Sequence, residues 1–160
     1  HGGIAGALLA LWFWIRRNNL SFLDLTDLLV PALALGQAIG RWGNYFNQEL
    51  YGIPTTLPWG IPIDPPNRIP SFADTPYFHP TFLYESIGDI VIACVCIISL
   101  RRYGKSGRVT MLYLFLYSLL RFSLEFIRVD PTPIFAGLRL PQWVSIGVAA
   151  IAIVLLKMKR

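Results

Sequence analysis

Residues 36–52 read GQAIGRWGNYFNQELYG, and they follow directly on a run of apolar residues. The stretch brings together Arg41, two asparagines and Glu49, separated by glycines, where the hydrophobic run ends. Charged and amide side chains are costly in an apolar environment unless they have a partner or a function. The stretch therefore indicates both the end of a hydrophobic segment and a candidate functional site.

The composition is that of a membrane protein. Of the 160 residues, 54% are hydrophobic and 14% are charged, and the mean hydropathy is +0.52. The apolar residues form long runs, which are typical of transmembrane segments. We expect an all-α integral membrane protein with about five transmembrane helices, because lipid leaves an isolated segment no other way to satisfy its backbone. The apolar segments cover about residues 2–15, 22–40, 82–100, 109–127 and 142–156.

A polar stretch, residues 44–80, separates the second and third apolar segments. It contains eight of the twelve prolines. Because proline removes a backbone donor and restricts φ, we predict an irregular extracytoplasmic arm with little regular structure. Connections of this length are often functional. Residues 1–160 are expected to form a single transmembrane domain, which is the C-terminal part of a longer protein because the chain begins with His1 and lacks an initiating methionine.

The basic residues predict the orientation. Nine of the fourteen fall at three places that alternate so as to share one side of the membrane, which the positive-inside rule assigns to the cytoplasm: Arg16, Arg17, Arg101, Arg102, Lys105, Arg108, Lys157, Lys159 and Arg160. The net charge of +5 therefore follows the membrane segments and does not indicate a nucleic-acid surface. The other five lie in the outer half of the membrane or beyond it: Arg41, Arg68, Arg121, Arg128 and Arg139.

This topology gathers polar side chains from four segments near the outer face. They are His1, Arg41, Asn44, Asn47, Glu49, His79, Tyr84, Glu85, Arg121, Glu125 and Arg128. Such a gathering at one level is typical of a site rather than of scattered surface charge.

Arg121 and Glu125 lie inside the fourth apolar segment with i,i+4 spacing, and Arg128 extends the same helical face at i+7. An arginine in the middle of a membrane helix costs about 2.5–3.5 kcal/mol on insertion scales. Two interpretations remain open. The pair is either a structural ion pair, or an anion site in which Glu125 orients Arg121.

Arg41 is a second arginine at a similar level. Gly36 and Gly40 precede it with the spacing that lets helices pack closely, which explains the glycines but not the arginine. A guanidinium binds phosphate through a bidentate fork. Two arginines from different helices near the lipid headgroups would therefore suit a phospholipid phosphate.

The remaining candidates have a structural and a functional interpretation each. Asn44, Asn47 and Glu49 follow Arg41 where the helix should end, so they either cap it or bind a polar headgroup. His1 is either structural or a general base. Tyr84 fits an aromatic belt at the membrane interface.

Glu85 and Asp89 form an acidic i,i+4 pair that could neutralise the arginines. Cys94 and Cys96 lie in an apolar run and are interpreted as buried thiols. Two histidines and scattered carboxylates make no convincing metal site.

Four blocks in order carry a resemblance that spans essentially the whole chain. They are HGGIAG at residues 1–6, GRWGNYFNQELYG at 40–52, HPTFLYES at 79–86 and RFSLEFIR at 121–128. Together they resemble the prolipoprotein diacylglyceryl transferases of bacterial membranes. One departure is that the family's N-terminal part, with earlier spans and a functional tyrosine, is absent here, so this piece is not expected to be active alone.

The resemblance implies transfer of the diacylglyceryl group of phosphatidylglycerol to the lipobox cysteine of a preprolipoprotein signal peptide. The reaction forms a thioether and releases glycerol phosphate at the extracytoplasmic face of the bacterial cytoplasmic (inner) membrane. No cofactor or metal is implied, because the phospholipid carries its own leaving group. The implied catalytic residues are His1, Arg121 and Glu125, and the implied substrate-binding residues are Arg41, Asn44, Glu49, Gly52, Tyr84 and Arg128.

Two other classes of function fit the same charges. A non-enzymatic lipid or solute transporter would line a pathway with them, although no internal repeat is evident. A structural scaffold would use the arginines only in ion pairs, and the gathering of polar residues at one level argues against it.

Overall fold

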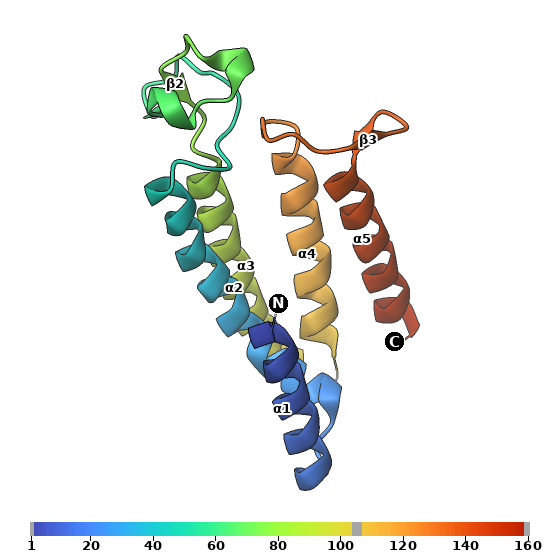
Figure 1. Cartoon of the computed structure of the whole chain (residues 1–160). Helices are drawn as coiled ribbons and strands as arrows, with labels where there is room; N and C mark the ends of the chain where they lie inside the picture. Colours follow the sequence, from blue (N-terminus) through green and yellow to red (C-terminus); the bar gives the residue numbers. More distant parts are fainter. Residues whose placement is uncertain (1, 104–106, 159–160) are drawn as a thin grey trace.

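The computed structural model describes residues 2–103 and 107–158, which form five α-helices joined by loops (Figure 1). The helices are α1 (Gly2–Asn18), α2 (Phe22–Phe46), α3 (Thr81–Tyr103), α4 (Arg108–Leu124) and α5 (Leu140–Met158). Helix α3 packs on α2 and on α4, and α4 packs on α5, with consecutive helices running in opposite directions (Figure 1). The predicted helical fold is confirmed.

Helix α2 is longer than its apolar run predicted. Ser21 caps its start by accepting from the backbone N–H of Asp24 at 3.4 Å, and the helix then continues through Pro31. It ends only at Phe46, with Asn47 as the C-cap. Arg41 and the residues after it therefore lie on the last turns of a helix, because backbone hydrogen bonding continues past the point where the residues turn polar.

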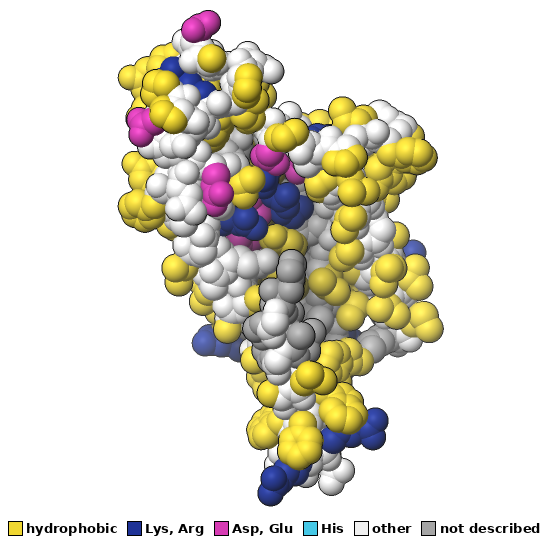
Figure 2. Space-filling view, viewed as in Figure 1, with side chains coloured by type: hydrophobic (Ala, Val, Ile, Leu, Met, Phe, Trp, Pro, Cys, Tyr) yellow, Lys and Arg dark blue, Asp and Glu magenta, His cyan; other side chains and the backbone are white. Residues whose placement is uncertain are grey.

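Three helices within the described ranges, α2, α3 and α5, are long and apolar enough to cross a membrane. Helices α1 and α4 have 17 residues each, somewhat fewer than the ~20 that a span of average tilt needs. Figure 2 shows hydrophobic side chains along the outer faces of the helices, and large exposed apolar residues occur on all of them. Three of the five predicted spans thus meet the length and hydropathy expected of membrane helices.

The buried core lies where α2, α3 and α4 meet. It includes Ala34 from α2, Ala93 and Cys96 from α3, and Val109 and Tyr113 from α4. Small side chains let the α2 and α3 backbones approach, since packing contacts replace the hydrophobic effect between helices in lipid. The core fixes the relative position of the three helices that carry the polar residues above it.

The close helix contact lies at a different glycine from the predicted pair. A Cβ on Gly88 would lie 2.6 Å from the Leu120 side chain, so α3 and α4 approach closely there. At Gly36 and Gly40 a Cβ would meet no described atom within 4 Å, so the predicted packing at those glycines is not made by the described residues. Cys94, predicted to be buried like Cys96, is instead exposed on α3.

A buried carboxylate ties the start of α2 to the start of α4. Asp27 accepts from the backbone N–H groups of Gly107 at 2.7 Å and Thr110 at 2.8 Å, and from the Thr110 hydroxyl at 2.7 Å. Gly107 is the N-cap residue and has no side chain to cap the helix. Asp27 supplies the missing cap from another helix, which aligns these ends of α2 and α4.

The connection between α2 and α3, here called the arm (residues 47–80), is folded around its own small core. Strand β1 (Ile61–Pro62) pairs antiparallel with β2 (Tyr77–Phe78), and two short 3₁₀ turns, η1 (Pro65–Asn67) and η2 (Pro70–Phe72), lie between them. Tyr51, Ile63 and Phe78 are buried together. Little of the arm is helix or strand, yet side-chain packing gives it a defined shape.

A second connection, between α4 and α5, contains the hairpin of β3 (Ile134–Phe135) and β4 (Leu138–Arg139). Its turn residues Ala136 and Gly137 both have positive φ, 48° and 79°, as tight two-residue hairpins require. The hairpin places Arg139 directly before α5, above the end of α4.

Candidate functional site

The centre of the candidate site is the carboxylate of Glu85 on α3. Arg41 of α2 places Nη2 2.8 Å from Oε1, and Arg121 of α4 places Nη1 3.2 Å from Oε2. The Glu85 side chain is only 3% exposed. Helices α2 and α4 therefore bring two guanidinium groups to one buried carboxylate, and the predicted neutralisation of the arginines by Glu85 is confirmed.

Glu125 extends this cluster on the other side of Arg121. Its Oε2 lies 3.4 Å from Arg121 Nη2, which confirms the pair predicted from i,i+4 spacing. Glu125 is the C-cap residue of α4, one position beyond the helix end at Leu124. Its side chain is 1% exposed, so a buried carboxylate one helical turn after Arg121 orients its guanidinium.

Arg139 is part of the same cluster, and sequence reasoning placed it on the outer side without a role. Its Nε lies 3.2 Å from Glu125 Oε1, close enough for an ion pair but not aligned as a hydrogen bond. Its guanidinium also donates to the backbone carbonyls of Glu125 at 3.0 Å and Arg128 at 2.7 Å, and to that of Asp130. Arg139 thus holds the loop after α4 in place. The only sequence signal was a cation directly before an apolar helix.

The two kinds of charge differ in exposure. The side chains of Arg41, Arg121 and Arg139 are 22%, 18% and 17% exposed, whereas the carboxylates beneath them are almost completely buried. Figure 2 shows basic and acidic side chains gathered in a hollow below the arm. The arginines can therefore meet an anion from outside while the buried carboxylates fix their positions.

A cleft of about 490 Å³ adjoins the cluster between the arm and the β3–β4 connection. Glu125 and Arg139 belong to both the cluster and the cleft, and Arg128 and Gln142 line it as well. Apolar side chains such as Phe72 and Ile134 form other parts of its wall. The cleft next to Arg128 and Arg139 therefore combines polar donors with apolar surface, as ligand sites commonly do.

Two further polar side chains lie under the arginines. Asp89, one helical turn from Glu85, is completely buried, and neither of its carboxylate oxygens has a hydrogen-bond partner within the described residues. Arg41 Nη2 also donates to the Tyr117 hydroxyl at 3.3 Å. Asp89 was predicted, with Glu85, to neutralise the arginines, but it forms no ion pair with them within the described residues. Tyr117 was not predicted as part of the site.

Asn44 and Glu49 form a second group close to the end of α2. The side-chain amides of Asn44 and Asn47 donate to Glu49 Oε1 at 2.9 and 3.2 Å. Within residues 2–103 and 107–158, the Glu49 carboxylate thus accepts from amides and forms no ion pair with an arginine. This group closes the turn that leads into the arm.

Tyr84 lies at the junction of the arm and α3. Its hydroxyl accepts from Trp59 Nε1 at 2.9 Å and lies 3.0 Å from His79 Nδ1. Because its ring is held by two groups of the arm, Tyr84 links the arm to the start of α3. Neither of these two contacts joins Tyr84 to the Glu85 cluster.

Arg128 does not continue the face of α4 as the i+7 spacing predicted. The helix ends at Leu124, and the chain then turns, so Arg128 instead pairs with Asp130 at 3.0 Å. Arg128 also forms an antiparallel bridge with Gly52. The helical spacing failed here because it assumed that the helix continues to Arg128, four residues beyond its end.

Gly52 lies where three chain segments cross. A Cβ there would be 2.8 Å from the Cβ of His79 and 2.9 Å from the Ile127 carbonyl oxygen. Its N–H donates to the His79 carbonyl at 2.9 Å. Only glycine fits this crossing without displacing the backbone, which explains on structural grounds why glycine occupies position 52.

His1, the predicted base, lies outside the described residues.

These features define a class: a helical membrane protein that carries a buried arginine–carboxylate cluster near one end of its helix bundle. The family model for prolipoprotein diacylglyceryl transferase matches residues 1–158, and the chain belongs to this family.

Curated relatives agree with the family match. Phosphatidylglycerol–prolipoprotein diacylglyceryl transferase 2 of Streptomyces coelicolor is 43% identical over 146 residues, 91% of this chain and 46% of its own length. The transferases of Gloeobacter violaceus and Thermotoga maritima are 45% and 47% identical, over 92% and 81% of this chain and 55% and 45% of their own lengths. The chain thus spans about half the length of the curated relatives it matches.

Proposed function

We propose that the whole protein transfers the diacylglyceryl group of phosphatidylglycerol to the lipobox cysteine thiol of preprolipoproteins. The observation that carries the proposal is the meeting of Arg41 and Arg121 on Glu85, with both guanidinium groups partly exposed. Membership of the family and the names of the relatives support the same reaction.

In this reaction a sulfur–carbon bond forms and a carbon–oxygen bond of the phosphate ester breaks. The thiol proton passes to a base, for which His1 is the candidate, because the thiolate is the nucleophile. Glycerol phosphate leaves with the electron pair of the broken bond. Arg41 and Arg121 would bind the phosphate as its charge develops, which is where preorganised donors accelerate a reaction most.

The carboxylates would act by positioning. Glu85 and Glu125 hold the two guanidinium groups in fixed directions, so little reorganisation is needed when the lipid arrives. Asn44 and Glu49 would contact the glycerol headgroup, and Arg128 would line the adjoining cleft. Gly52 and Tyr84 would shape the site through the arm.

We further propose that α1 and α4 also cross the membrane, giving five spans in a single transmembrane domain. The position of α4 between α3 and α5 supports this. Basic residues occupy the last turns of α1, α3 and α5, three helices that run in the same direction. The positive-inside rule therefore favours a cytoplasmic location for the end of the bundle at which these three helices finish. The arm and the arginine cluster would then lie near the extracytoplasmic face of a bacterial inner membrane.

The test is release of glycerol phosphate by the full-length protein from phosphatidylglycerol and a lipobox peptide. Arg41→Ala and His1→Ala should each lower the rate at least about a hundredfold, the usual effect of removing one essential donor or base. Arg17→Ala, at the opposite end of the bundle, is the matched control. No release from folded, lipid-bound protein would favour a transporter or scaffold instead. Release that persists when the peptide cysteine is replaced by serine would mean hydrolysis of the lipid and not transfer to the thiol.

A further inference from the structure

The hairpin of β3 and β4 presents two large apolar side chains that residues 2–103 and 107–158 leave uncovered. Ile134 is 71% exposed and Phe135 is 72% exposed. Figure 2 shows hydrophobic side chains gathered over this connection. Apolar side chains that gather in this way on a surface mark a site of contact with a protein or a membrane.

The apolar surface of the hairpin continues onto the first turns of α5. Leu140, Trp143 and Val144 lie on one face of this helix by their spacing, and all three are exposed. Trp143 joins the two elements, because its Nε1 donates to the Phe135 carbonyl at 2.8 Å and its ring meets the Phe135 ring edge-on. The hairpin therefore shares one surface with a helix that is long and apolar enough to cross a membrane.

The charge of this region is directed into the protein. Arg139 is the only charged residue between positions 131 and 156. Its guanidinium pairs with Glu125 at 3.2 Å and donates to backbone carbonyls of the loop after α4. The hairpin could therefore enter an apolar environment without taking an unpaired charge with it.

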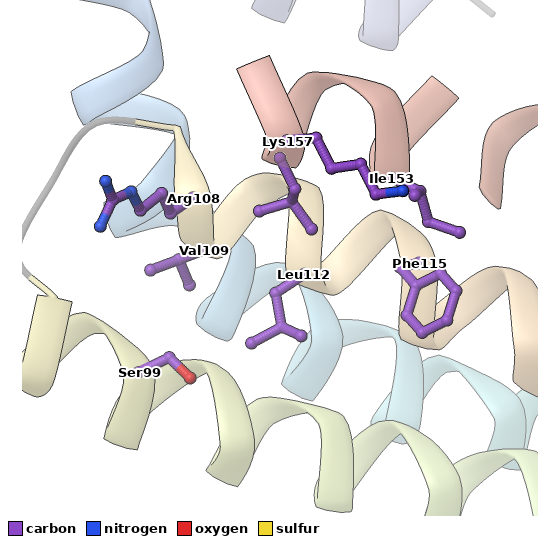
Figure 3. A pocket seen from close by; sticks show the side chains of 8 residues that line it. Ser99, Arg108, Val109, Leu112, Phe115, Ile153 and Lys157 are labelled. Atoms are coloured by element: carbon purple, nitrogen blue, oxygen red, sulfur yellow. The ribbon is translucent and has the colours of Figure 1, made fainter. Parts of the chain in front are cut away.

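The apolar length of α5 is short for a membrane. Lys157, which lies at the far end of α5 in Figure 3, is the first charged residue after Arg139. From Leu140 to Leu156 the helix rises roughly 25 Å at about 1.5 Å per residue, whereas the hydrocarbon core is about 30 Å thick. A short span is accommodated by thinning of the bilayer or by snorkelling of flanking residues. Apolar surface beside the start of the helix would serve the same purpose.

Packing holds α5 less tightly at the Lys157 end. A cavity of about 630 Å³ lies there between α5 and helices α3 and α4, and Ile153 and Leu156 line it (Figure 3). At the opposite end, the Leu140 N–H donates to the Pro133 carbonyl at 2.9 Å, in addition to the bond from the indole. The hairpin is therefore attached to the better-held end of α5, where it could set the depth of the helix.

We propose that the β3–β4 hairpin is a membrane-interface anchor that extends the apolar length of α5. Ile134 and Phe135 insert where the headgroups meet the acyl chains, in the leaflet on the side of the arm. Trp143 lies beside them at a depth that its amphipathic ring favours. Lipid is the partner that covers the hairpin and the outer face of α5 without a break, whereas a protein partner would have to displace lipid from that helix.

The test uses the full-length protein in phosphatidylcholine nanodiscs, with an environment-sensitive fluorescent amino acid in place of Phe135. The same amino acid in place of Val144 gives the reference in lipid, and in place of Asp74, which is exposed on the arm, it gives the reference in water. Lipids brominated near the headgroup end of their acyl chains quench from the membrane, and iodide quenches from water. The probe at position 135 should be quenched by the brominated lipid, as at 144, and should be shielded from iodide, unlike the probe at 74.

Bilayer thickness provides a second readout. In thin bilayers of short-chain phosphatidylcholine, α5 alone matches the core, so iodide should reach the probe at position 135 but not the probe at 144. Equal shielding of position 135 in thick and thin bilayers would overturn the role of the hairpin in extending α5.

Two results would overturn the anchor itself. Iodide quenching at position 135 as strong as at 74 would place the hairpin in water. Shielding from both quenchers would show that another segment of the chain or a second copy covers it. Because these readouts report location alone, their outcome is independent of whether the protein is a transferase.

Discussion

Arg41 and Arg121 lie on different helices and bind one buried carboxylate, that of Glu85, at 2.8 and 3.2 Å. Two guanidinium groups brought this close together would repel each other without the negative charge between them. Glu85 therefore holds them at a separation at which an incoming phosphate could take up both. The relationship gives a physical reason for the buried Glu85 near the start of α3.

Replacing Arg41 with lysine tests whether its shape or its charge matters. Lysine keeps the positive charge but loses the planar fork, so we expect the rate of glycerol phosphate release to fall at least about tenfold, since a hydrogen bond to a charged group contributes roughly 1.5–3 kcal/mol. Thermal unfolding of the same variant checks that it folds. A lysine variant with full activity would mean that Arg41 serves charge balance only.

Replacing Glu85 with glutamine should destabilise the helix bundle. The amide cannot neutralise Arg41 and Arg121, so two partly buried cations lose their shared partner, and the loss is about 1–3 kcal/mol after allowance for their partial exposure. The midpoint of thermal unfolding in detergent is the measurement. Glu49→Gln is the matched control, because Glu49 is exposed and bonded only to amides. Equal midpoints for the two variants would contradict a central role for Glu85.

A methyl group at Gly52 should loosen the arm. In Gly52→Ala the new Cβ would meet the Cβ of His79 at 2.8 Å and the Ile127 carbonyl at 2.9 Å, and overpacking of this kind costs about 1–3 kcal/mol. Limited proteolysis within residues 53–76 should become faster than in the native protein. Gly147→Ala, where a Cβ meets no described atom within 4 Å, is the control. Unchanged cleavage would mean that the crossing can widen at little cost.

Removal of the Asp27 carboxylate should free the start of α4. Asp27→Ala loses two backbone caps and the Thr110 hydroxyl bond, and we expect a loss of about 2 kcal/mol in the free energy of unfolding. Asp27→Asn keeps one acceptor oxygen and should lose less. Asp24→Ala, one turn earlier on α2, should have little effect. If Asp24→Ala and Asp27→Ala were equally destabilising, the effect would belong to the helix start and not to the cap on α4.

The sequence predicted the arginines as a site and part of the way they are held together. Spacing of four residues was enough to pair Arg121 with Glu125, because a regular helix turn brings such residues to one face. The same reasoning failed for Arg128, since the helix ends at Leu124 and a loop then points the side chain toward Asp130. Local periodicity cannot show where a helix stops when tertiary contacts terminate it.

The sequence by itself determined the helices, the gathering of basic residues at one end and the level of Arg41 and Arg121, because hydropathy, periodicity and charge act over a few turns of chain. Only the tertiary structure decided that Glu85 lies between those arginines, that Arg139 returns from a hairpin to Glu125, and that Asp27 caps a distant helix. These contacts join residues far apart in sequence. Each depends on how the helices pack, and neither spacing nor composition contains that information.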